Sequence, residues 1–212
     1  MRAAILTAVA TSILLLAPWA PSWASSPAAM AAGSFQSGLQ ASTSSRWTLD
    51  FRSGEFRLFT AADGCDYWYM TYTVVNRTGQ DRMWAPRFDL LSDDGQIRRS
   101  GRDVPSSVVS EILRVMGNPL LEDQNQVIGE LLQGVENAKE GLVVWPANNL
   151  AIKEMTVFGS GLSGETKVVP DPMTGEAVTL SRTLSRAYVT AGEPVLRPSE
   201  PLRLREQLWI WR

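Results

Sequence analysis

Alternation of apolar and polar side chains predicts β-strands over most of the chain beyond residue 46. The clearest run covers 66–76, where the side chains on one face are apolar or aromatic: Trp68, Met70, Tyr72 and Val74. Such side chains pack well on a pleated surface, so this run predicts a strand. Asn76 and Gly79 then supply turn chemistry. We expect this strand to organise the rest of the fold.

A second central strand is predicted at 84–90, with Arg87 and Asp89 on the face opposite Phe88. Pro86 cannot donate a hydrogen bond to a neighbouring strand, which places it at a sheet edge or a bulge. The dipeptide Asp94-Gly95 is a strong hairpin signal, so a return strand should cover 96–98.

Other segments repeat the two-residue period. Two alternating runs within 47–59 flank Ser53-Gly54, which predicts an opening hairpin. Further strands are expected at 142–145, 152–158, 166–169, 177–189 and 204–211. About eight strands with one layer pattern predict a single β-sandwich domain, residues 46–212.

Between about 104 and 133 the apolar spacing is that of helices. Val108, Ile112 and Met116 recur along one face, Pro105 fits a first helical turn and Gly117 a helix end. A second helix is predicted over 122–133 from four apolar residues: Val127, Ile128, Leu131 and Leu132. The sandwich should therefore carry a two-helix insertion.

The N-terminus reads as a targeting segment. Arg2 precedes the apolar run 3–17, Pro18 ends that run, and Ser22-Trp23-Ala24 offers small residues to a signal peptidase. We predict a signal peptide at 1–24, a flexible linker at 25–45 that is rich in Ala, Ser, Gly and Pro, and export to the periplasm or beyond. The alternative is a retained membrane anchor. After signal cleavage we expect no stable membrane span.

Composition removes several kinds of chemistry. The chain has no histidine, which excludes Ser-His-Asp and Cys-His catalysis and the common zinc sites. The net charge of −2 argues against nucleic acid as the main partner. The single cysteine, Cys65, has no internal disulfide partner and is either buried or available to a second copy. No motif calls for a cofactor.

Two groups of residues are candidate binding surfaces. Trp209 and Trp211 share one face of the last predicted strand, and we expect that face to be exposed because Leu208 and Ile210 can point inward. Arg98, Arg99 and Arg102 form a basic loop that could meet an anionic polymer or headgroup. The structural interpretations are core packing for the tryptophans and simple solvation for the arginines.

Two further patterns have structural explanations. The glycine-rich segment 159–164 lacks the Lys-Ser/Thr ending of a phosphate-binding loop and precedes no helix, so it predicts a connection between strands. The carboxylates needed for glycoside hydrolysis are present, but spacing singles out no pair. Most of them fit turns or solvated helix faces.

The run YMTYTVVNRTGQDR with the later PRFDLLSDDG resembles small immunoglobulin-like sandwich domains of exported bacterial proteins. Together with GNPLLEDQNQVIGELLQGVENAKEGLVVWP and MTVFGSGLSGET, it resembles a family of uncharacterised secreted bacterial proteins. The resemblance covers roughly 47–211. It implies an immunoglobulin-like antiparallel β-sandwich and no particular activity.

We therefore expect a non-enzymatic exported module of the bacterial cell envelope, either structural or binding an envelope protein or polysaccharide. Its loops and helical insertion would offer the contact surface. Two alternatives remain open. One is a histidine-free hydrolase that uses paired carboxylates. The other is a glycan-binding module that uses surface tryptophans.

Overall fold

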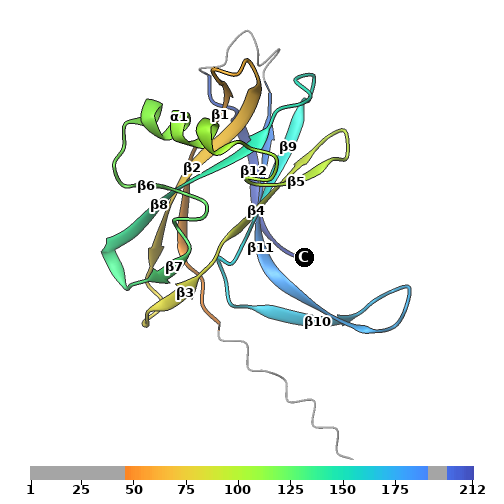
Figure 1. Ribbon diagram of the computed structural model, residues 1–212. Coiled ribbons are helices and arrows are strands. Elements are labelled where there is room, and N and C mark those ends of the chain that lie inside the picture. The colour runs from red at the N-terminus through yellow and green to blue at the C-terminus, as the bar shows by residue number, and fades with distance from the viewer. Residues whose placement is uncertain (1–45, 191–199) are drawn as a thin grey trace, which may run out of the picture. The chain divides into compact units, whose positions relative to one another are not determined.

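The computed structural model describes residues 46–190 and 200–212. The predicted signal peptide (1–24) and linker (25–45) lie outside the described residues. In the described part strands predominate, as predicted, and two sheets pack against each other around a shared core (Figure 1). The described helix is short, and no helix of these residues is long and apolar enough to cross a bilayer.

The first sheet has the strand order β1-β2-β8-β6, and all pairs are antiparallel except β6 with β8. Its strands are β1 (Asp50–Thr60), β2 (Asp66–Asn76), β6 (Leu121–Asp123) and β8 (Gly134–Pro146). A separate two-stranded ribbon consists of β3 (Arg82–Trp84) and β7 (Gly129–Leu131).

The second sheet has the order β10-β11-β9-β4-β5, with β12 paired to β11. Its strands are β4 (Arg87–Ser92), β5 (Ile97–Arg99), β9 (Glu154–Ser160), β10 (Thr166–Pro170), β11 (Ala177–Val189) and β12 (Arg203–Trp211). These bounds confirm the strand predicted at 66–76, the return strand predicted after Asp94-Gly95 and the strands predicted beyond residue 142. The glycine-rich segment 159–164 ends β9 and continues into the connection to β10, which covers 161–165, so its predicted role between strands is confirmed.

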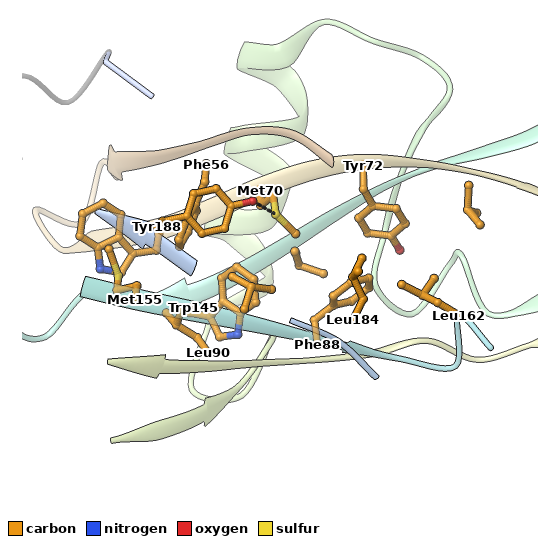
Figure 2. Packing of buried hydrophobic residues seen from close by; sticks show 14 of the residues in the cluster. Phe56, Met70, Tyr72, Phe88, Leu90, Trp145, Met155, Leu162, Leu184 and Tyr188 are labelled. Atoms are coloured by element: carbon orange, nitrogen blue, oxygen red, sulfur yellow. Dashed lines mark hydrogen bonds between the residues drawn. The ribbon is translucent and has the colours of Figure 1, made fainter. Parts of the chain in front are cut away.

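The main core lies between the sheets, and the inner face of β2 runs through it. Figure 2 shows side chains from both layers meeting there. Phe56 of β1 has three aromatic neighbours with ring centroids 4.9 to 5.8 Å away: Trp68, Trp145 and Tyr188. Tilted and edge-to-face pairs of this kind are favourable beyond the area that they bury.

The outer face of the first sheet is also buried over the second half of β8 and at Tyr67 of β2. α1 (Ser106–Met116) lies over it and inserts Val108 and Ile112, which are 2% and 1% exposed. They pack in a second cluster that includes Tyr67 and Val144. The helical spacing predicted for this segment is confirmed, and Gly117 ends the helix in the left-handed conformation, as predicted.

The predicted opening hairpin is wrong, because residues 50–60 form one continuous strand. Its register against β2 shifts between Ser53 and Phe56, where one extra residue is accommodated as a bulge. The bulge moves the inward-facing apolar positions from odd numbers (Leu49) to even numbers (Phe56, Leu58). The change of phase therefore marks a bulge and not a turn.

The predicted second helix is also wrong. Residues 121–131 contain β6, a turn and β7, so the insertion has one helix, not two. Gly129 has a φ of 149°, which a helix excludes. Of the apolar residues that suggested the helix, Val127 and Leu131 are buried while Ile128 and Leu132 are 50% and 42% exposed.

The predicted strand 84–90 is divided into two. Pro86 lies between β3 and β4, which belong to different sheets. Before this break, the turn after β2 is held by Asn76, whose buried side chain donates to the carbonyls of Gln80 and Leu131 and accepts from Thr78. The predicted turn role of Asn76 is thereby confirmed.

Asp89 lies on the face of β4 opposite Phe88, as predicted, but its side chain is only 3% exposed. It accepts from Arg87 and from Arg212 at the end of β12, each at 2.9 Å. The hydrogen bond to Asp89 and the negative charge of Asp89 raise the pKa of Arg87. Arg212 also lies over the ring of Phe158, 4.6 Å from its centroid. Asp89 thus ties β12 to β4 across the outer face of the second sheet.

Replacing Gly141 of β8 by Ala is expected to destabilise the fold by about 2 kcal/mol. The added Cβ would overlap the ring of Tyr72, which is 2% exposed and stacked on Phe51. Urea unfolding of the purified protein measures the change. The double variant with Tyr72→Leu should cost less than the sum of the two single variants. A single-variant cost below about 0.5 kcal/mol would contradict the packing described.

Replacing Asp89 by Ala is expected to cost about 2 kcal/mol, because two arginines lose their shared charged acceptor. The matched control is Glu154→Ala on the neighbouring strand β9. Glu154 pairs with Arg205, but both side chains are more than half exposed, so this loss should cost less than about 1 kcal/mol. Thermal and urea unfolding compare the variants, and equal costs would contradict the role given to Asp89.

Candidate functional site

Both predicted tryptophans lie on β12, but on the inward side of the second sheet. Trp209 is directly opposite the buried Leu184 of β11, and it packs against the main core. The guanidinium of Arg182 lies 4.7 Å from its ring centroid. Trp211 is 42% exposed and Leu208 is 38% exposed. The expectation that Leu208 and Ile210 supply the inward face is therefore wrong, because Leu184 decides which face of β12 meets the core.

The predicted basic loop is partly a strand. Arg98 and Arg99 belong to β5 and point to opposite faces, since Arg98 is opposite Leu90 and Arg99 is opposite Asp89. Arg102 follows in the turn before α1. Arg99 is on the outer face of the sheet, and Arg98 is on the inward face but on β5, which β4, β9 and β11 separate from β12. The structure therefore does not bring these candidates into one site.

A cavity of about 200 Å³ lies between α1 and the outer face of the first sheet; we call it the α1 cavity. Its wall is formed by five apolar side chains, Val104, Val109, Leu113, Leu142 and Val144. Its rim carries six polar ones, Ser106, Ser110, Asp123, Gln124, Asn125 and Gln126. An apolar wall with a few convergent polar groups is the usual composition of a ligand site.

The helix positions one side of the α1 cavity. Val108 and Ile112 anchor α1 to the sheet, so residues one position further along, Val109 and Leu113, are left half-buried beside the opening. Ser106 and Ser110 are one turn apart and line the same side. A helix laid on a sheet by one apolar stripe therefore leaves this flank open.

The turn 123–126 forms the opposite rim, and its backbone is held by reciprocal hydrogen bonds. The Asp123 carboxylate accepts from the N–H groups of Asn125 and Gln126 at 2.7 and 3.0 Å. The N–H of Asp123 in turn donates to the side-chain carbonyl of Gln126 at 3.1 Å. These bonds fix the turn while leaving the amides of Gln124 and Asn125 free to face a ligand.

Gln124 is the most unusual polar group of the rim. Its Oε1 is buried and has no hydrogen-bond partner in the described part of the protein. The side chain lies against Gly101, where an added Cβ would overlap the amide, and the Gly101 N–H donates to the carbonyl of Val144 at 2.8 Å. Buried polar atoms are nearly always paired, so this oxygen marks a place where a ligand group or water is expected.

Acid–base chemistry is weakly supported by the electrostatics. The α1 cavity and two smaller cavities, of about 100 and 10 Å³, each contain one carboxylate: Asp123, Glu140 and Asp94. The pKa of Asp94 is lowered by hydrogen bonds from the Ser92 hydroxyl and the Gln96 N–H, and that of Asp171 by the N–H groups of its own turn. A general acid requires a raised pKa instead.

Other groups fit structural roles. Burial raises the pKa of the Tyr72 hydroxyl, and the negative charge of Glu122 raises it further. The thiol of Cys65 is exposed in its turn. No group of three or more His, Cys, Asp or Glu side chains within 46–190 and 200–212 is arranged to hold a metal ion.

The rim at 123–126 was missed at the sequence level because its residues were assigned to a helix. The signal that could have found it is the run Asp123-Gln124-Asn125-Gln126, which is polar throughout and begins with a residue that caps turns. Gly129, three residues later, is a poor helix former and supports a turn there.

Comparison of the chain with protein-family models, with curated proteins and with solved structures found no match.

Proposed function

We propose that the protein is a non-enzymatic, exported binding module of the bacterial cell envelope, and that its binding site is the α1 cavity. The scaffold would be a sandwich of the immunoglobulin-like kind, with the helix as an insertion. Export is supported by the sequence of residues 1–24, with its basic start, apolar run and small residues before a cleavage point. The partner would be an envelope protein or a polysaccharide.

The observation that carries this proposal is the polar rim of the α1 cavity. Ser106, Ser110, Gln124 and Asn125 contribute no side-chain hydrogen bond to the described fold, although they converge on one opening. Asn76 and Asp89, which have structural roles, are by contrast bonded within the fold. The rim is therefore better explained by binding than by stability.

The alternative of a carboxylate hydrolase has less support. Glycoside hydrolysis needs two carboxyl groups about 5 to 9 Å apart across a substrate. Asp123 is the one carboxylate of the α1 cavity, and one of its oxygens already accepts from two N–H groups. The alternative of glycan binding by tryptophans is weakened by the packing of Trp209 against the core.

A cavity-blocking variant tests the proposal. Ser110→Trp would place an indole in the opening, whereas Ser107→Trp makes the same change on the same helix at a residue that does not line the cavity. Each protein is immobilised and exposed to an envelope extract, and retained proteins and sugars are measured by mass spectrometry. We expect Ser110→Trp to reduce the retained partner at least about tenfold, which corresponds to 1.4 kcal/mol of binding energy.

The control should retain the partner at the wild-type level. Thermal unfolding of both variants checks that the fold is kept, which is expected because both serines are exposed. Equal retention by the two variants, or no specific retention by the wild type, would contradict the assignment of the α1 cavity as a binding site.

A further inference from the structure

The charge of the α1 cavity restricts its ligand. Asp123 is the one ionisable side chain among the residues that line it, and neither Lys nor Arg is among them. Sites for phosphate, sulfate or carboxylate ligands use Arg or Lys to balance the negative charge. An anionic ligand would here face Asp123 without compensation. A cation would meet a carboxylate that is already engaged by two N–H groups. The lining therefore favours a neutral ligand.

The hydrogen-bonding groups restrict it further. The side chains of Gln124 and Asn125 each offer a donor and an acceptor, and those of Ser106 and Ser110 do the same through one hydroxyl. The buried Oε1 of Gln124 can accept from a ligand donor, since the described fold provides none. Groups that donate and accept at the same atom, as hydroxyls do, satisfy such a rim most completely.

The apolar wall and the volume of the α1 cavity restrict the shape and size of the ligand. Val109, Leu113 and Val144 present an apolar surface opposite the polar rim, which suits a ligand with a C–H face. The volume of about 200 Å³ is below the roughly 300 to 1,000 Å³ of sites for drug-sized molecules, so one ring is accommodated.

We infer that the α1 cavity binds one neutral sugar ring, with the hydroxyls on the amide rim and the C–H face on the wall formed by α1 and β8. This inference rests on the proposed function and names its ligand class. A peptide segment fits less well, because a peptide backbone carries one donor and one acceptor per residue, spread over about 3.3 Å of extended chain. The ring concentrates its hydroxyls where the six polar side chains converge.

The test is a titration of the full-length purified protein, followed by backbone amide NMR, with defined probes. The probes are glucose, N-acetylglucosamine, glucuronate, inorganic phosphate and a capped dipeptide. We expect the neutral sugars to shift the amide signals of residues 104–113 and 123–126. Glucuronate and phosphate should bind at least about fivefold more weakly, because the negative charge of Asp123 repels them.

Gln124→Leu should weaken sugar binding about tenfold, and Asn125→Ala about fivefold, as expected for the loss of hydrogen bonds to a ligand. The exposed Asn125 gives a second readout if Gln124→Leu perturbs the contact with Gly101. The matched control is Gln96→Leu. Gln96 lies in the turn between β4 and β5 and is not among the residues that line the α1 cavity. It should bind as the wild type does.

Three results would overturn the inference: tighter binding of phosphate or glucuronate than of neutral sugars, binding of the dipeptide at the same residues in place of sugar, or no binding of any probe. The proposed function is judged separately by the capture experiment. If Ser110→Trp abolishes capture while no sugar binds, the site stands and its ligand belongs to another class.

Discussion

The burial of both faces of β8 over its second half is the constraint on which the other described elements depend. In an ordinary sandwich a strand faces the core on one side and water on the other. Here Val143 and Trp145 are buried between the sheets, while Leu142 and Val144 on the opposite face are 1% and 2% exposed. Apolar surface removed from water contributes roughly 25 cal/mol per Å², so an uncovered outer face would forfeit much of this stabilisation. Something must cover it, and α1 does.

The way in which α1 packs on the first sheet explains the geometry of the α1 cavity. α1 contacts the sheet through a narrow stripe, Val108 and Ile112, whereas the outer face of β8 continues past it through Leu142 and Val144. The parallel strand β6 and the turn 123–126 approach from the far side but do not close the gap. The α1 cavity is the space between these covers. Its apolar wall follows from the need to bury β8, and only its polar rim needs another explanation.

Local periodicity was sufficient wherever one face of an element was buried. The two-residue alternation predicted β9, and the helical spacing predicted α1, because in each case the buried residues follow a single period. It failed at 122–133, where Val127 and Leu131 are buried by a turn and a short ribbon and not by a helix. Two buried residues four positions apart are compatible with a helix and also with a turn followed by a short strand. Gly129 is the residue in this segment that favours the turn.

The α1 cavity was beyond such reasoning because three distant segments form it, near residues 101–113, 123–126 and 142–144. The predicted orientation of the tryptophans on β12 was wrong for a related reason. Alternation showed that Trp209 and Leu208 lie on opposite faces, but only the neighbouring Leu184 shows which face is inward. A terminal strand alone carries no such information.

The rim also bears on stability. The Oε1 of Gln124 has no donor within the described fold, so a ligand group or a water molecule completes its hydrogen bonding. A ligand that donates to Oε1 would bridge the turn that follows β6 to α1, two elements attached to the same outer face. Binding free energy at the cavity would therefore be coupled to the docking of the helix, because a ligand that binds only the folded protein stabilises it. The helix that protects the outer face of β8 from water is then also the element that a ligand would secure.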